Sequence, residues 1–548
     1  MQYWLLISLA FLFSSCGINR SLKQTPNIGF YPKSTHQLIV HSDSLRTIDH
    51  NFLRKNRAGN WEMYLDGNAY DLGTKNGLLT QDLYQNQESI FFEGVQQLLG
   101  DKKKTGFLNF FLRWFNRDIQ KHISEEYKTE IFALSQFSNP DFDSIAKPYP
   151  RALYLHAAHD IGHAMNDLMI VGCSSFAVWD ENSMDGELLV GRNFDFYLND
   201  DFAENKVVQF VQPENGYAYL SIGWPGFVGV TSGMNVEGLS VTINAGKSSI
   251  PLKAKTPIAL LVREILQYAK TIEEAIAIAK TREVFVSESL MISSAFDRKA
   301  ILIERSPKKI GIVQPSGSWL ISTNHFLSSP FEADKRNQKH IANSHSAYRY
   351  QILEQEIHDL KPFDDQKVVQ VLRNLKGLNH QDIGLGNEKA LNQLLAHHAV
   401  VFRPEKKLVY VSSAPYNMGE FTVYDLTKLQ EKMYPTVKIV VDSLRVPQHP
   451  FVLTKAFEQY ELFKKKRLTI HRAHERKTAL DNGFIEQYVA TNPEFWQVYY
   501  DAGINAKLQG DLAKAEKYFL LARSKEVTTK SDWHSIEKQI RKVQKKKR

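Results

Sequence analysis

Two short runs decide how this chain folds: Val171-Gly172-Cys173-Ser174-Ser175-Phe176-Ala177 and Gly191-Arg192-Asn193-Phe194-Asp195. The first run alternates apolar and polar residues after the glycine, which predicts a β-strand that starts at the cysteine. Polar residues between the two runs predict a turn into a second strand. Antiparallel pairing would then bring the thiol of Cys173 close to the guanidinium of Arg192 and the carboxylate of Asp195.

Cys173 has a structural and a chemical interpretation. The chain contains two cysteines, Cys16 and Cys173. A lone cysteine is usually a small buried hydrophobe, and Arg192 with Asp195 could form a surface salt bridge. The glycine before Cys173 and the Arg-x-x-Asp on the opposite strand favour the chemical interpretation.

These motifs together resemble the N-terminal-nucleophile hydrolases, in the branch that contains penicillin acyltransferase and the choloylglycine (bile-salt) hydrolases. The resemblance covers roughly residues 55–430. It implies an α+β fold, a four-layer αββα sandwich, with a C-terminal all-helical appendage added here. It implies no cofactor and no metal. The matching motifs are Gly172-Cys173, Gly191–Asp195, Glu237-Gly238-Leu239 with Asn244, Asn324, and Ser346–Tyr350 with Arg349.

The same resemblance implies an enzyme that activates itself. The thiol of Cys173 would attack the carbonyl of Gly172, and an N-to-S acyl shift followed by hydrolysis would free Cys173 as a new chain start. We expect the glycine to supply the strained backbone angles that this attack requires. The new α-amine, with a pKa near roughly 7.7–8.0, would take the thiol proton, so that one residue supplies both nucleophile and base.

Five further residues are assigned to the site by the family motifs. Arg192 would favour the thiolate, and Asp195 would hold the amine or the substrate. Asn244, at the end of a predicted strand, matches the asparagine that stabilises an oxyanion. Asn324 and Arg349 would orient the pocket. Without the resemblance, Asn244 could merely begin a turn and Arg349 could form a surface salt bridge.

Three histidines lie in a helix predicted over residues 154–167. His156, His159 and His163 have helical spacing, which would allow two metal ligands on one face. We prefer a polar helix face, or a role in shaping the precursor near the nucleophile, because the proposed chemistry needs no metal.

The N-terminus has the features of an exported lipoprotein. Residues 5–13 form an apolar run too short to span a bilayer, and small residues precede Cys16. This resembles a bacterial lipoprotein cleavage box. We therefore expect a signal peptide over 1–15 and a lipidated Cys16 that anchors the protein in a cell-envelope membrane. A plain signal peptide is the alternative, because no Lys or Arg precedes the apolar run and Phe13 stands where leucine is usual.

The remaining chain divides into four predicted parts. Residues 16–50 would be a tether, 51–172 a segment released as a separate chain by self-cleavage, and 173–435 the catalytic core. Residues 440–548 have a helical pattern, with one tetratricopeptide-like unit near 495–525 and a basic tail. Because repeat arrays normally need about three units, we expect a helical appendage packed on the core, with a protein partner as a second possibility.

The composition limits the classes of partner. The formal net charge is +8, and the chain closes with Lys545-Lys546-Lys547-Arg548. No aromatic residues are interleaved with a basic patch, so we expect no nucleic-acid partner and interpret the basic end as a solvated tail.

The function predicted is that of an autoproteolytically activated N-terminal-cysteine hydrolase or acyltransferase. It would act on a non-peptide amide C–N bond of a small N-acyl amide, through an acyl thioester that passes to water or to an amine. Linear or cyclic amides, β-lactam-related compounds, N-acyl amino acids and N-acyl lipids all remain open. Trp224 and Phe227 could line an acyl pocket or lie in the core.

Two other functions compete with this prediction. One is a catalytically inactive, lipid-anchored interaction protein that uses its helical tail. The other is a cysteine peptidase, which would need His325 or His397 as the partner of Cys173; neither histidine lies in a peptidase motif.

Overall fold

The computed structural model describes residues 24–31, 35–99, 113–157, 160, 170–197, 199–249, 251, 253–430 and 432–547. Cys16, His159 and His163 lie outside these ranges, and so does the second half, residues 161–167, of the helix predicted over 154–167.

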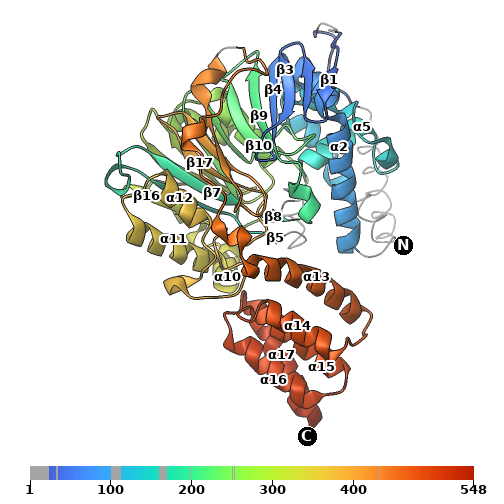
Figure 1. The fold of residues 1–548 in the computed structure, drawn as a ribbon. Coiled ribbons are helices and arrows are strands. Elements are labelled where there is room, and N and C mark those ends of the chain that lie inside the picture. The colour runs from blue at the N-terminus through green and yellow to red at the C-terminus, as the bar shows by residue number, and fades with distance from the viewer. Residues whose placement is uncertain are drawn as a thin grey trace, which may run out of the picture.

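Two β-sheets stack face to face at the centre of the molecule (Figure 1). The larger sheet is antiparallel except for one pair, β4 with β9, which is parallel. The smaller sheet is antiparallel throughout. In spatial order the larger sheet contains β1 (Ile39–Ser42), β2 (Leu45–Ile48), β3 (Asn51–Lys55), β4 (Trp61–Gly67), β9 (Val207–Pro213), β10 (Tyr219–Gly223), β11 (Ser232–Asn235), β12 (Leu239–Ala245), β13 (Glu288–Ser294), β14 (Lys299–Arg305) and β15 (Ile310–Val313). The smaller sheet contains β16 (Trp319–Ser322), β6 (Ser174–Val178), β7 (Leu189–Phe194), β17 (His398–Arg403), β18 (Leu408–Ser412) and β19 (Phe421–Asp425).

Helices cover the outer face of each sheet, which completes the four layers. The larger sheet is covered by helices that include α2, α4, α7 and α8, and the smaller sheet by α11 and α12. The helices are α2 (Ala69–Leu99), α4 (Glu125–Ser135), α5 (Pro148–His156), α7 (Ile258–Tyr268), α8 (Ile272–Thr281), α9 (Ser329–Glu332), α10 (Lys335–Asn343), α11 (Ser346–Leu360), α12 (Asp365–Leu372), α13 (Lys455–Glu475), α14 (Asn482–Thr491), α15 (Trp496–Leu508), α16 (Leu512–Ser524) and α17 (Lys530–Lys547). The α+β, four-layer αββα prediction is confirmed.

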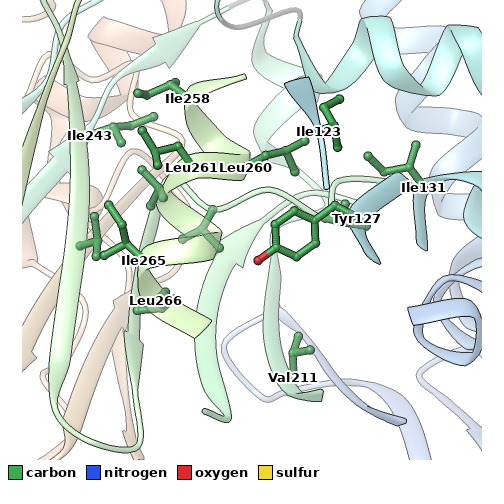
Figure 2. Close-up of a cluster of buried hydrophobic side chains, with 14 of the residues drawn as sticks. Ile123, Tyr127, Ile131, Val211, Ile243, Ile258, Leu260, Leu261, Ile265 and Leu266 are labelled. Carbon is green, nitrogen blue, oxygen red and sulfur yellow. The ribbon is translucent and has the colours of Figure 1, made fainter. Parts of the chain in front are cut away.

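Apolar periodicity explains how α7 binds the larger sheet. Ile258, Leu261 and Ile265 recur at three- and four-residue spacing and are fully buried. Figure 2 shows them beside Ile243 of β12, with Tyr127 of α4 on the other side. Each such aliphatic side chain contributes about 1.5–3 kcal/mol when it leaves water, so this contact fixes the helix on the sheet.

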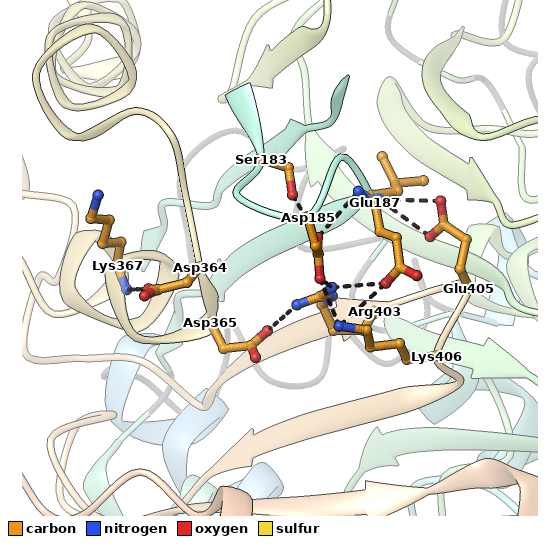
Figure 3. A network of polar contacts seen from close by, with 10 residues as sticks. Ser183, Asp185, Glu187, Asp364, Asp365, Lys367, Arg403, Glu405 and Lys406 are labelled. Carbon is orange, nitrogen blue, oxygen red and sulfur yellow. Dashed lines mark hydrogen bonds and ion pairs between the residues drawn. The ribbon is translucent and has the colours of Figure 1, made fainter. Parts of the chain in front are cut away.

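The β6–β7 hairpin is locked at its turn by an ionic network (Figure 3). Arg403, buried at the end of β17, donates hydrogen bonds to Asp185, to Glu187 at 2.9 Å and to Asp365 at 3.0 Å. Glu405 accepts the backbone N–H of Leu188. The turn is therefore tied to β17 and to the start of α12, which fixes the register of the strand that carries Arg192.

The ends of the catalytic unit differ from the prediction. The stretch predicted as a tether over 16–50 includes β1 and β2, which extend the larger sheet. The C-terminal helices begin at Lys455 and not near 440, because Val440 and Val446 still pair with β19. The helix predicted over residues 154–167 begins earlier, at Pro148.

The C-terminal helices form their own hydrophobic cluster below the sandwich (Figure 1). Phe519 of α16 packs on Gly503 of α15, where a Cβ would meet the ring at 2.6 Å. The cluster also contains Leu394 and Met418 of the catalytic unit, so the appendage is packed on the core as expected. Within the described residues, no helix has the length and apolar character needed to cross a membrane.

Candidate active site

Cys173 lies at the start of β6 with its side chain buried and each of its polar groups in contact with a side chain. Its backbone N–H donates to Asn324 Oδ1 at 3.0 Å, and its carbonyl accepts from Arg349. Arg192 Nη2 lies 3.7 Å from Sγ. Antiparallel pairing of β6 with β7 delivers Arg192, because Ser175 faces Arg192 across the hairpin.

Several contacts fix the position of Arg192 next to Sγ of Cys173. Its guanidinium is buried, lies over the Phe194 ring at 4.3 Å and donates to the carbonyls of Thr231 and Ile243 and to Ser232 Oγ. A surface salt bridge, the alternative considered from the sequence, is therefore wrong for this residue.

Asp195 follows the last residue of β7 and has a buried carboxylate that accepts no hydrogen bond from any described residue. Burial raises the pKa of this carboxyl to about 8, although Arg349 and Arg192 act in the opposite direction. A buried carboxylate without a hydrogen-bond partner is costly, so this group is suited to accept from a donor that the described part of the uncut chain does not provide.

Asn324 and Arg349 form a bonded pair beside the nucleophile. Arg349 Nη2 donates to Asn324 Oδ1 at 2.6 Å, and Nη1 donates to Ser174 Oγ at 2.8 Å. Asn324 Nδ2 donates to the Ala245 carbonyl at 3.0 Å, which fixes its amide orientation. Arg349 is fully buried on α11, so the surface salt bridge considered for it is also wrong.

Asn244 lies on β12 of the larger sheet, next to Ala245, whose carbonyl accepts from Asn324. Its Nδ2 donates to the carbonyl of Ser322 at 2.9 Å and to Ser322 Oγ at 3.2 Å, and its Oδ1 accepts from Ser175 Oγ at 3.1 Å. It is an interior strand residue and does not begin a turn. In the uncut chain its donor is occupied by Ser322, and its assignment to an oxyanion stays a prediction.

The thiol of Cys173 is neutral in this environment. Burial raises its pKa to about 11, and the nearby Arg192 only partly offsets this effect. The prediction that Arg192 favours the thiolate is correct in direction, but burial outweighs it in the uncut chain.

The structure explains the glycine at position 172 by a lack of space for a side chain, and not by unusual backbone angles. Its φ lies outside the left-handed region, so the predicted strain is absent. A Cβ at this position would lie 2.4 Å from Gln393 Nε2. Gly172 N donates to the Asp195 carbonyl at 3.0 Å, which continues the short pair β5 (Ile170–Val171) and β8 (Phe196–Tyr197).

An aromatic pocket shares two rings, Phe196 and Phe202, with the cluster that contains Cys173, although Cys173 does not line the pocket itself. Cys173 packs in one cluster with Phe194, Phe196 and Phe202, and Trp224 stacks at the edge of this cluster. The pocket itself lies between α2, the end of α5 and the β10–β11 connection, and is lined by Tyr84, Gln87, Glu88, Phe91, Leu155, His156, Phe196, Phe202, Trp224, Pro225, Gly226 and Phe227. Trp224 and Phe227 thus line a pocket, as one of the two sequence interpretations expected.

Of the histidines singled out from the sequence, the three that the structure describes make other contacts. In His156 both ring nitrogens are used, by the Ala152 carbonyl and the Val228 N–H. His325 bonds Thr323 and Ser346, and His397 bonds His398. In the described parts of the chain, no three metal-binding side chains gather at one point.

Sequence reasoning missed three contributors. Ser232 Oγ accepts a hydrogen bond from Arg192 and lies 2.8 Å from His398 Nε2. Gln393 contacts the carbonyl of Gly172. None of the three lies in a motif. Only tertiary packing brings them to the site.

Comparison with known proteins supports the resemblance. Residues 181–414 match the family model "Acyl-coenzyme A:6-aminopenicillanic acid acyl-transferase". Five of the six proposed catalytic residues lie in this range, and Cys173 precedes it.

Curated relatives are distant. An N-acylethanolamine-hydrolyzing acid amidase of Caenorhabditis elegans is 21% identical over 292 residues, 49% of this chain and 74% of the relative. Protein dcd1B of Dictyostelium discoideum is 24% identical over 226 residues, 39% of this chain and 44% of the relative. An uncharacterized protein of Archaeoglobus fulgidus is 24% identical over 244 residues, 40% of this chain and 39% of the relative. The chain therefore spans less than half the length of two of these relatives.

Solved structures with detectable likeness include the C. elegans amidase ortholog, at TM-score 0.31 and 18% identity over 42% of this chain and 93% of that one. A mutant form of the conjugated bile acid hydrolase of Clostridium perfringens has TM-score 0.32 and 14% identity over 48% of this chain and 96% of that one.

Proposed function

Because its central region belongs to the acyl-coenzyme A:6-aminopenicillanic acid acyl-transferase family of N-terminal-nucleophile hydrolases, we propose that this chain is a self-activating cysteine amidase or acyltransferase. The observation that carries the proposal is the convergence of Arg192, Asp195, Asn324 and Arg349 on Cys173, from positions up to 176 residues apart.

Activation is proposed to occur at the Gly172–Cys173 bond. Sγ adds to the Gly172 carbonyl carbon, the C–N bond breaks and the nitrogen takes the thiol proton, which leaves a thioester and a free α-amine. Water then hydrolyses the thioester, so that Gly172 ends one chain and Cys173 begins the other. The carboxylate of Asp195 supports this scheme, because the new amine would supply the hydrogen-bond donor that this carboxylate lacks among the described residues.

In the mature enzyme the α-amine of Cys173 would accept the thiol proton as Sγ attacks a substrate amide. The acyl group would enter the aromatic pocket, whose rings Phe196 and Phe202 also pack in the cluster with Cys173, so we propose substrates whose acyl part is apolar. The amine part would leave, and the thioester would pass its acyl group to water or to a second amine.

Intact-mass analysis of the purified protein tests activation. Wild type should give two fragments that meet at Gly172–Cys173, whereas Cys173→Ala should stay whole. Cys16→Ala, which removes the other cysteine, should cleave like wild type. An uncut wild type that nevertheless hydrolyses N-acyl amides would contradict the scheme.

Location is proposed from the N-terminal motif alone. A lipid on Cys16 would anchor the enzyme to a cell-envelope membrane. Growth with an alkyne-tagged fatty acid should label wild type, and the label should be lost in Cys16→Ala but kept in Cys173→Ala. Equal labelling of both variants would reject lipidation at Cys16.

A further inference from the structure

Both polar atoms of the Gly172–Cys173 peptide group are bound by side-chain amides. The Cys173 N–H donates to Asn324 Oδ1 at 3.0 Å, and Gln393 Nε2 donates to the Gly172 carbonyl oxygen at 3.4 Å. Asn324 belongs to the site predicted from the sequence, but Gln393 does not. Its contact is to the one oxygen on which negative charge would develop during self-cleavage.

Gln393 is built into this position. Its side chain is fully buried, and its Oε1 has no hydrogen-bond partner among the described residues. The amide lies so close to Gly172 that a Cβ there would be 2.4 Å from Nε2. A glycine before the nucleophile is therefore what permits this donor to reach the carbonyl.

The loop that carries Gln393 is fixed on both sides. Leu394 adopts a φ of 51° and donates its N–H to Asn392 Oδ1 at 2.9 Å, and Asn392 Nδ2 donates to the Tyr416 carbonyl at 2.9 Å. From the appendage, Tyr460 of α13 donates through its hydroxyl to the Leu394 carbonyl at 3.3 Å. A left-handed non-glycine residue is strained and persists only when its surroundings enforce it.

The C-terminal helices also contact the earlier part of the same loop, at residues 384–387. Asn387 Nδ2 donates to the Glu526 carbonyl at 2.9 Å, and Thr528 Oγ1 donates to Asn387 Oδ1 at 3.0 Å. Gly384 packs against the backbone of Phe495, where a Cβ would be 2.4 Å away. The C-terminal helices thus hold the loop that delivers the amide to the scissile carbonyl.

We propose that Gln393 is a catalytic residue of self-cleavage, held in place by the C-terminal helices; this rests on the self-cleavage proposed above. As Sγ adds to the Gly172 carbonyl carbon, the oxygen becomes an oxyanion and the Gln393 N–H donates to it. The oxyanion then collapses, the C–N bond breaks and the Cys173 nitrogen takes the thiol proton. Water hydrolyses the resulting thioester.

Two physical reasons make this donor effective. It is excluded from water, where a hydrogen bond to a developing charge is stronger than in solution. The 3.4 Å separation in the uncut chain can shorten as charge builds on the oxygen, since such contacts tighten toward the transition state.

The test is the rate of precursor cleavage in the full-length protein, followed by intact mass after synthesis. Gln393→Ala should slow cleavage on the order of 10²-fold, the cost of losing one oxyanion donor. Gln393→Met keeps a similar side-chain volume but has no N–H to donate, so it should slow cleavage at least as much. Tyr460→Phe should slow it less, because it only loosens the loop.

Gln267→Ala is the matched control. Gln267 is also a fully buried glutamine bound to a backbone carbonyl, but it lies on α7 and does not touch the Gly172–Cys173 bond. It should cleave at the wild-type rate even if its melting temperature falls. Cleavage of folded Gln393→Met at the wild-type rate would overturn the assignment to Gln393 alone, whereas an uncut wild type would overturn self-cleavage itself.

Discussion

At position 172 a side chain of any size would collide with the amide of Gln393, and this explains the glycine better than backbone strain does. Gly172→Ala should therefore cleave slowly and lose about 1–3 kcal/mol of folding stability through overpacking. Gly317→Ala, at a position with no atom within 4 Å of a Cβ and an ordinary φ, should change neither.

A double variant tests whether Gln393 affects cleavage by donating a hydrogen bond or only by occupying space next to residue 172. Gln393→Ala in the Gly172→Ala protein gives the new Cβ room, so the melting temperature should recover while cleavage stays slow. Recovery of both properties would mean that Gln393 only fills space and donates nothing.

The carboxyl of Asp195 predicts a particular dependence of stability on pH. Burial raises its pKa to about 8, above the value of about 3.9 in an unfolded chain. Between these values the folded precursor keeps a proton that the unfolded chain has lost, so this group's contribution to stability falls as pH rises through the window. At pH 5 the contribution is largely intact, and above pH 8 it is lost.

Urea unfolding of the uncut Cys173→Ala protein checks this effect. Asp195→Asn does not titrate, so its stability relative to Asp195 should rise from pH 5 to pH 8, by at most about 4 kcal/mol at 1.4 kcal/mol per pKa unit. Asp201→Asn, which removes an exposed carboxylate, is the control in the same background. A pH-independent difference for Asp195→Asn would mean that this carboxyl ionises normally in the folded precursor.

At the scale of secondary structure, the local pattern predicted the β6–β7 hairpin, the strand that ends near Asn244 and the helical C-terminal region. Helices α7 and α8 have regular aliphatic spacing, with a capping box from Thr271 and Glu274 at the start of α8. The strands β1 and β2 were missed, because both are four residues long and partly or fully exposed, and so carry a weak apolar signal.

The candidate site could be predicted where it follows from one hairpin or one family motif, and not elsewhere. Arg192 reaches Cys173 through a pairing visible in the sequence. Gln393 reaches Gly172 from 221 residues away, through a loop whose shape depends on the C-terminal helices. No local pattern contains that information.

Several elements together form the aromatic pocket, and its lining predicts which acyl groups the enzyme prefers. Trp224→Ala opens the wall formed with Phe202 and Phe227. Mature enzyme with this change should have a raised KM for N-acyl amides with long apolar acyl groups and little change for N-acetyl amides, because only the former would lose buried contact area.

Steady-state kinetics over a series of acyl lengths measures this preference. Phe296→Ala is the control, since Phe296 is 74% exposed in the β13–β14 turn. Equal losses for short and long acyl groups would place the acyl chain elsewhere.

At the scale of the whole molecule, the predicted boundary at the cleavage point is not a structural boundary. The segment before Cys173 contributes β3 and β4 to the interior of the larger sheet, and β4 pairs in parallel with β9 from the segment after Cys173. Helix α2, from the same segment, packs on that sheet and lines the aromatic pocket through Tyr84 and Phe91.

Self-cleavage should consequently leave the two chains bound to each other. Separation would expose the backbone edge of β9 and apolar side chains such as Met63 and Leu65, which are buried in the intact fold. Size-exclusion chromatography of cleaved protein should give a single peak that contains both fragments and elutes with uncut Cys173→Ala. The fragments should part only in denaturant, and amidase activity should disappear with them, since α2 would leave the pocket open. Native elution of two separate peaks with activity kept in the Cys173 chain would show that the first segment is a removable propeptide and not part of the working enzyme.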